Sequence, residues 1–330
     1  MKVLAELLGE SPEMRTIRER ITRLLQTLGG GRRMPSVLLQ GETGTGQSLL
    51  ARAIHDAGPR CHGPFVSVNC AAIPAPLIEA ELFGFERGAF TDARRAKPGL
   101  FQLARGGTIV LDEIGLLPEE LQGKLLQVVD ERRVRRLEGT QSELLDAWII
   151  SASNEDLALA ARERRFRHDL YYRLAVVTFW LPALRERQED ILQLANHSLQ
   201  RACADYELPP KSLSLDAQAA LLHHAWPGNV RELSNVIEQA ALLSGTEVLS
   251  AEALSLVTPD TRDRAPGRCV SPLKVELRQI ERNRLLEALG RTGWKLSPAA
   301  ALLGIPRNTL RYQLKRLDLW NGRPGRARGP

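Results

Sequence analysis

A glycine-rich segment, Gly41-Glu42-Thr43-Gly44-Thr45-Gly46-Gln47-Ser48, is the clearest candidate for chemistry in this chain of 330 residues. It follows an apolar run at residues 36–40 and precedes a helical pattern at residues 48–57. A strand, a glycine-rich loop and a helix in this order direct backbone N–H groups and a helix N-terminus at one place, which suits phosphate binding. The segment matches the P-loop pattern GxxxxGK[ST] except at the lysine, which is Gln47. We therefore predict a phosphate site, with an ordinary strand–helix turn as the alternative.

Gln47 changes what such a loop can do. Lysine brings a full charge to the β- and γ-phosphates, and hydrogen bonds to charged groups are worth about 1.5–3 kcal/mol, whereas a neutral amide offers less. Binding can rest on the loop amides, but an electrostatic contact to charge in a transition state is typically worth around 10²–10³ in rate. Ser48 keeps the hydroxyl that can hold Mg²⁺. The loop predicts binding of ATP with Mg²⁺ and leaves hydrolysis open.

Two adjacent acids end a second apolar run, at residues 108–113. Asp112, at the carboxyl end of this predicted strand, can orient the Mg²⁺ shell, and Glu113 can polarise an attacking water. A single acid at a strand end often serves solubility. Two acids in a chain that also carries a P-loop pattern favour a nucleotide site.

Apolar runs at residues 36–40, 65–69, 108–112 and 147–153 predict strands that alternate with helices at 48–57 and 119–130. This alternation is typical of an α/β fold with a parallel sheet. From residue 189 the strand pattern stops, which predicts a small all-helical subdomain. The expected divisions are 1–188 for the α/β part, 189–257 for the helical part, 258–272 for a linker, 273–319 for a small helical domain and 320–330 for a disordered basic tail.

Charge is unevenly distributed along the chain. The net charge is +6, yet residues 273–330 contain 13 lysines and arginines against 4 acids. A basic module behind a near-neutral domain is suited to a polyanion, although a solvated basic surface is the alternative. No apolar run approaches the roughly 20 residues of a membrane span, and the N-terminus lacks a signal-peptide pattern. We therefore expect a cytoplasmic protein without a membrane partner.

Residues 296–317 have the spacing of a helix-turn-helix. Ser297 and Pro298 suit the start of its first helix, Gly304 the turn, and Pro306 the start of its second helix. A plain helical hairpin is the alternative, which the basic charge disfavours. The second helix is predicted to present base-contacting residues to the major groove and phosphate-contacting residues beside them: Arg307, Asn308, Arg311 and Tyr312, then Lys315 and Arg316.

With these motifs placed, residues 7–319 resemble the AAA+ family of bacterial enhancer-binding proteins, activators that remodel RNA polymerase bearing sigma-54. The most specific match is GAFTDA at residues 88–93, which is similar to the GAFTGA surface loop of that family. The resemblance implies that Phe90 and Thr91 contact sigma-54. Asp92 replaces the second glycine, which adds charge and removes backbone freedom. The C-terminal module resembles the Fis type.

The same resemblance implies roles around the nucleotide. Asn69 matches the residue that holds the catalytic glutamate, and Asn154 matches sensor I. Arg167 and Arg173 match arginine fingers that reach a neighbour's γ-phosphate, and Arg231 matches sensor II on the helical lid. Fingers acting on a neighbour imply a ring, a hexamer or heptamer by resemblance.

Three hypotheses follow. In the first, the chain binds upstream DNA and ATP, forms a homo-oligomeric ring and acts on sigma-54 RNA polymerase. In the second, it regulates transcription from DNA without hydrolysis or sigma-54, because Gln47 and Asp92 both weaken the motor. In the third, it joins a mixed ring and lends its arginines to a hydrolysing neighbour.

Overall fold

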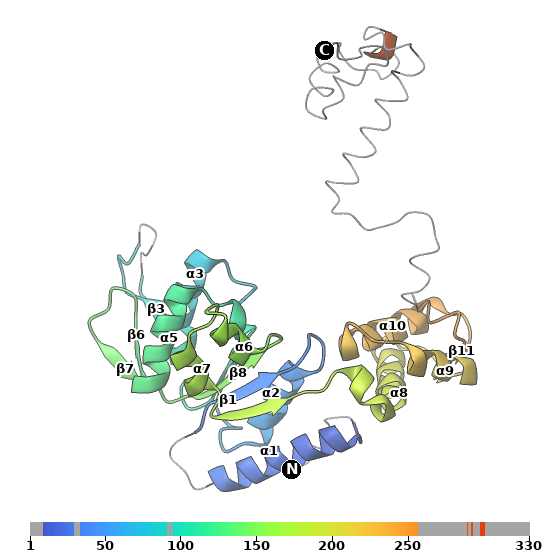
Figure 1. The fold of residues 1–330 in the computed structure, drawn as a ribbon, viewed down its shortest axis with the longest axis horizontal. Helices are drawn as coiled ribbons and strands as arrows, with labels where there is room; N and C mark the ends of the chain where they lie inside the picture. Colours follow the sequence, from blue (N-terminus) through green and yellow to red (C-terminus); the bar gives the residue numbers. More distant parts are fainter. Residues whose placement is uncertain are drawn as a thin grey trace, which may run out of the picture. The chain divides into compact units, whose positions relative to one another are not determined.

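The computed structural model describes residues 9–29, 34–90, 93, 95–256, 289, 292 and 298–300 (Figure 1). The chain divides into two compact units, Met1–Leu256 and Val257–Pro330. The first unit is described almost throughout. In the second unit, the six predicted DNA-contacting residues between Arg307 and Arg316 lie outside the described residues.

A five-stranded, fully parallel sheet forms the centre of the first unit, in the order β2-β5-β8-β1-β9. The predicted α/β class with a parallel sheet is thus confirmed. Two strands have the predicted bounds, two begin one residue later, and β9 lies at the sheet edge where no strand was predicted. The strands are β1 (Val37–Gln40), β2 (Phe65–Asn69), β5 (Thr108–Asp112), β8 (Trp148–Ser153) and β9 (Val177–Trp180).

Helices cover both faces of this sheet because successive side chains of a strand point to opposite sides. In β1, Val37 and Leu39 join one buried cluster with α1 and α2, whereas Leu38 joins the cluster on the other face with α5 and α7. Figure 1 shows α1 and α2, in blue, on one side of the sheet. The helices of this part are α1 (Pro12–Leu28), α2 (Gln47–Ala57), α3 (Ala75–Phe83), α4 (Leu100–Leu103), α5 (Glu119–Glu131), α6 (Leu157–Arg162) and α7 (His168–Leu174), with the 3₁₀ turn η2 (Ile114–Leu116).

Two short antiparallel pairs project from the α/β part. The first joins β3 to β4 around the GAFTDA loop, and the second is a hairpin of β6 and β7. Backbone hydrogen bonds from Glu86 N to Leu137 O and from Leu137 N to Gly84 O connect the two. The bounds are β3 (Gly84–Phe85), β4 (Lys97–Pro98), β6 (Arg133–Arg135) and β7 (Ser142–Leu144).

A helical subdomain at residues 184–256, called the lid below, completes the first unit. Its core surrounds Trp226, which is fully buried and donates its indole N–H to Leu221 O at 2.9 Å. The prediction of an all-helical subdomain needs one correction, because Ser212–Leu213 and Val248–Leu249 pair as the short parallel strands β10 and β11. The lid elements are η3 (Leu184–Glu186), α8 (Gln188–Asp205), β10 (Ser212–Leu213), α9 (Leu215–His223), α10 (Asn229–Leu243) and β11 (Val248–Leu249).

Across the described part of the chain, every helix is too short or too polar to cross a membrane.

Candidate functional site

The glycine-rich loop lies between β1 and α2, as predicted from its flanking patterns. Gly41, Gly44 and Gly46 all have positive φ, at 153°, 83° and 108°. At Gly44 the glycine is also required by space, since a Cβ there would lie 2.4 Å from Gly228 O of the lid. The loop therefore takes a wrapped conformation that side chains at these positions would oppose.

The lid closes directly on this loop through the first turn of α10. The backbone N–H groups of Val230 and Arg231 both donate to Gly44 O, at 3.0 and 3.3 Å. The buried side chain of Asn229 donates from Nδ2 to Thr43 O and to Glu42 Oε2, each at 3.1 Å. Loop and lid are thus joined by backbone and side-chain hydrogen bonds.

Glu42 is the charged part of the same junction. Arg185 of η3 holds its carboxylate with two hydrogen bonds, at 2.8 and 2.5 Å. These bonds, followed by the one from Asn229, lower the pKa of Glu42 to about 2. The carboxylate is therefore ionised across the physiological range. No motif in the sequence indicates this pairing, because its members are far apart in the chain.

A buried arginine supports the loop from the other side. Arg187 is 3% exposed and donates from Nη2 to Thr45 O at 2.8 Å, while its Nε has no hydrogen-bond partner among the described residues. Burial lowers its pKa, and the charge of Asp190 opposes that shift. Asp190 itself is fully buried and accepts hydrogen bonds from Ser11 N and Ser11 Oγ, which ties the start of α1 to α8.

The predicted acids lie at the carboxyl edge of the sheet beside the loop. Ser48 Oγ donates to Asp112 Oδ2 at 3.3 Å, which brings together the two residues predicted to hold Mg²⁺. Glu113 follows Asp112 in a left-handed backbone conformation with φ of 53°. Burial first, and then the charge of Asp112, raises the pKa of Glu113. Among the described residues, its buried Oε2 has no hydrogen-bond partner, which is unusual for a buried carboxylate oxygen.

Asn69 is the last residue of β2, and Asn154 directly follows β8; these two strands flank β5. Asn69 pairs in register with Asp112, and its Oδ1 accepts a hydrogen bond from Ala71 N at 2.8 Å. Among the described residues, the structure has no hydrogen bond from the Asn69 side chain to Glu113. Asn154 Nδ2 donates to Thr43 Oγ1 at 3.1 Å, which places it against the glycine-rich loop.

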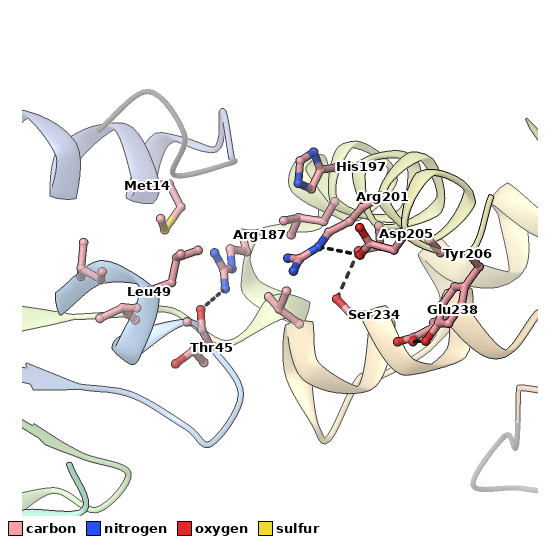
Figure 2. A pocket seen from close by; sticks show the side chains of 17 residues that line it. Met14, Thr45, Leu49, Arg187, His197, Arg201, Asp205, Tyr206, Ser234 and Glu238 are labelled. Atoms are coloured by element: carbon pink, nitrogen blue, oxygen red, sulfur yellow. Dashed lines mark hydrogen bonds and ion pairs between the residues drawn. The ribbon is translucent and has the colours of Figure 1, made fainter. Parts of the chain in front are cut away.

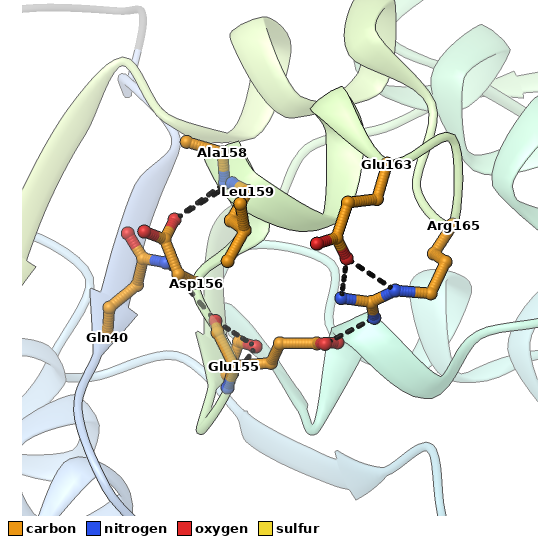
Figure 3. Close-up of polar contacts among 8 residues, drawn as sticks. Gln40, Glu155, Asp156, Ala158, Leu159, Glu163 and Arg165 are labelled. Atoms are coloured by element: carbon orange, nitrogen blue, oxygen red, sulfur yellow. Dashed lines mark hydrogen bonds and ion pairs between the residues drawn. The ribbon is translucent and has the colours of Figure 1, made fainter.

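The segment after Asn154 is held by local polar contacts (Figure 3). Gln40 Nε2 donates to Glu155 O at 3.3 Å, linking this segment to the end of β1. Asp156 accepts from Ala158 N and so caps α6. Arg165 pairs with both Glu155 and Glu163. These contacts position the end of β8 relative to the loop.

Most of these residues line one of two adjoining cavities. One, of about 280 Å³, is lined by the predicted loop, acid and lid residues: Thr43, Gly44, Gly46, Gln47, Ser48, Asn69, Asp112, Glu113 and Arg231. The other, of about 950 Å³, lies between α1, α2 and the lid helices α8 and α10, with Met14, Leu49 and Arg187 among its lining residues (Figure 2). Gly46, Leu49, Val230 and Ser234 line both, so the cavities meet between the first turns of α2 and α10.

The predicted arginine fingers lie away from both cavities. Arg167, at the start of α7, pairs with Asp169 at 2.7 Å, and Arg173 pairs with Asp130 at 2.5 Å. Both guanidinium groups are about half exposed, at 43% and 55%. Within one chain, Arg167 and Arg173 therefore do not line the cavities beside the glycine-rich loop.

The GAFTDA loop presents an aromatic side chain. Phe90 is 46% exposed, and its ring lies 4.7 Å from that of Phe85. Gly88 N donates to Ala93 O at 2.9 Å, which closes the loop. Thr91 and Asp92 lie outside the described residues.

Three family models match successive parts of the chain. The model of the sigma-54 interaction domain matches residues 7–179, that of the AAA+ ATPase lid domain matches 185–267, and that of the bacterial regulatory protein, Fis family, matches 276–317. The predicted fold class, with a P-loop domain, a lid and a C-terminal helix-turn-helix, agrees with all three.

Relatives and solved structures match nearly the whole chain. The response regulator protein PilR of Pseudomonas aeruginosa is 42% identical over 316 residues, which cover 95% of this chain and 70% of PilR. The Nif-specific regulatory protein of Klebsiella pneumoniae is 40% identical, over 96% of this chain and 59% of that protein. A structure of NtrX from Brucella abortus in complex with ADP is 32% identical, with a TM-score of 0.68, over 94% of this chain and 70% of NtrX.

This chain therefore spans between 59% and 70% of the length of these relatives. Because the sigma-54 interaction domain alone accounts for just over half of its residues, with the lid and Fis-type modules behind it, the chain belongs to the family of sigma-54-dependent transcriptional regulators.

Proposed function

We propose that this chain binds ATP with Mg²⁺ at the glycine-rich loop, binds upstream DNA through its C-terminal helix-turn-helix and remodels the RNA polymerase holoenzyme that carries sigma-54. The observation that carries the proposal is the single cavity in which the loop, Ser48, the acid pair and Arg231 converge. NtrX of Brucella abortus, with the same fold, has been crystallised in complex with ADP and with ATP.

The residues present fit a magnesium nucleotide. The three positive-φ glycines leave backbone N–H groups free to approach phosphate oxygens, and α2 begins at the loop with its positive dipole end. The Ser48 hydroxyl and the Asp112 carboxylate are oxygen ligands of the kind Mg²⁺ prefers. Bound Mg²⁺ would neutralise phosphate charge. The larger, partly apolar cavity beside Leu49 has room for a nucleoside.

The other residues have distinct proposed tasks. Glu113, raised in pKa yet partnerless at Oε2, is suited to orient and polarise a water, and Asn69 and Asn154 flank it on neighbouring strands. Arg167 and Arg173 would reach the nucleotide of an adjacent subunit in a hexameric or heptameric ring. Phe90, with Thr91, would contact sigma-54.

Purified chain should be tested in transcription from a sigma-54 promoter with upstream binding sites, with sigma-54 holoenzyme, with and without ATP. ATP-dependent open-complex formation is the expected result. Phe90→Ala should abolish it without changing nucleotide binding, and Arg311→Ala should abolish it through loss of DNA binding. If wild type activates equally well without ATP, nucleotide-driven remodelling is refuted.

A second function is favoured by one observation, the Gln47 side chain, which is bonded to backbone carbonyls. In this second function the chain binds nucleotide without hydrolysing it and forms part of a mixed ring. Its Arg167 and Arg173 would contact the nucleotide of a neighbouring subunit that hydrolyses ATP. Steady-state turnover of wild type and Gln47→Lys separates the two functions. Brisk wild-type turnover rejects the second function, and turnover that appears only in Gln47→Lys rejects the first as an autonomous ATPase.

A further inference from the structure

Gln47 points its amide into the protein. Nε2 donates to Gly41 O at 3.0 Å and to Ser153 O at 2.8 Å, and the residue is buried. A glutamine amide has two N–H donors, so both are already used. Gln47 thus ties the beginning of the loop to the end of β8, and it has no donor left for a phosphate.

The smaller cavity consequently has an unusual charge balance. Arg231 is the one cationic side chain among its described lining residues, whereas Asp112 and Glu113 supply two carboxyl groups. The buried cation Arg187 lines only the larger cavity and is bonded to Thr45 O. A further negative charge near the acid pair therefore has little local compensation.

The two halves of a P-loop contact different phosphates. Backbone N–H groups of the loop cradle the α- and β-phosphates, whereas the lysine reaches the β- and γ-phosphates. In this chain the loop glycines have positive φ and α2 starts at the loop, so the backbone N–H groups needed for the first set of contacts are in place. Of the two phosphate contacts that Gln47 cannot make, the one to the γ-phosphate exists only in a triphosphate and therefore distinguishes it from a diphosphate.

From this we propose that the isolated subunit prefers a nucleoside diphosphate, with Gln47 as the specificity-determining residue. The inference rests on the proposed function, since it assumes that the loop binds nucleotide. A preference for triphosphate would then require cations supplied by another subunit. Binding of triphosphate by this chain would therefore depend on whether a neighbouring subunit is assembled beside it, and less on the concentration of ATP.

The test compares affinities for ADP and for a non-hydrolysable ATP analogue with Mg²⁺, measured by calorimetry on the full chain. Arg167→Ala/Arg173→Ala is the background, so that no neighbour supplies a cation. In this background, the protein that keeps Gln47 should bind ADP at least as tightly as the ATP analogue. One charged hydrogen bond corresponds to about 10- to 100-fold in affinity, so Gln47→Lys should tighten the analogue by that factor and ADP by much less.

Two further variants isolate the cause. Gln239→Lys adds the same charge on the exposed side of α10 and should change neither affinity. Gln47→Met removes the two backbone hydrogen bonds without adding charge, and it should keep the diphosphate preference. If Gln47→Met favours the analogue, or if wild type already does so by tenfold, the inference is overturned. If neither nucleotide binds wild type or Gln47→Lys, the proposed function itself fails.

Discussion

Replacing Asn229 with alanine should lower the free energy of unfolding of the first unit by about 3 kcal/mol, since it removes hydrogen bonds worth about 1 kcal/mol each in a buried place. Oδ1 accepts from Leu184 N at 2.7 Å, and Nδ2 donates to Glu42 and Thr43. Asn229 also has φ of 54°, a left-handed conformation that costs alanine roughly 1–2 kcal/mol and asparagine less. Rehydration of the exposed Glu42 carboxylate offsets part of this sum.

Urea denaturation followed by far-UV circular dichroism measures the effect, with the slope against urea checked for constancy. Asn235→Ala is the matched control, because Asn235 lies on the exposed side of the same helix, where substitutions usually stay within about 0.5 kcal/mol. Nucleotide affinity should fall in Asn229→Ala alone, since the residue holds Thr43 of the loop. Equal stability of the two variants would refute the assignment of Asn229 as the joint between lid and loop.

Three further outcomes are expected. Gly44→Ala should fold with its lid detached and lose nucleotide binding, because its Cβ would lie 2.4 Å from Gly228 O; unchanged protease sensitivity of the lid would contradict this. Burial lowers the pKa of His55 from 6.5, so the unfolded chain binds a proton that the folded chain excludes. The contribution of His55 to stability should therefore be fully present above pH 6.5 and decline below it. Thermal melts between about pH 8 and about pH 5.5 should show this decline for wild type and for the exposed-site control His62→Gln. The decline should be absent in His55→Gln. Ser48→Ala should weaken nucleotide binding in Mg²⁺ but not in EDTA, and an equal loss in both would exclude the metal role.

Much of the α/β framework could be predicted from local patterns. Residues 65–69 and 108–112 form strands with the predicted bounds because each is a short apolar run between turn residues, a signal that does not depend on distant contacts. The position of the P-loop could be predicted equally well, since the strand, the glycines and the start of the helix are consecutive in the chain. Strand β9 was missed because Val177–Trp180 has only four residues and follows a helix without a clear break.

The roles of the site residues remain predictions, and the structure changes what some of them can do. Asn69 ends β2 and Glu113 directly follows the neighbouring strand β5, as their positions after apolar runs imply, yet the Asn69 side chain accepts a hydrogen bond from Ala71 N. Whether two side chains at adjacent strand ends bond to each other depends on rotamers and on competing backbone donors, which no spacing rule encodes.

The sequence by itself determined the order of four strands of the central sheet, the phosphate loop and the missing lysine, because these are properties of contiguous residues. Only the tertiary structure decided where the Gln47 amide points, since its acceptor Ser153 O reaches it through the pairing of β1 with β8. The same holds for the joint of Glu42, Arg185 and Asn229, which packing of the lid against the loop brings together. Hydrogen bonds between distant segments depend on the fold that brings those segments together, which no local pattern encodes, and they give the loop motif its particular charge environment.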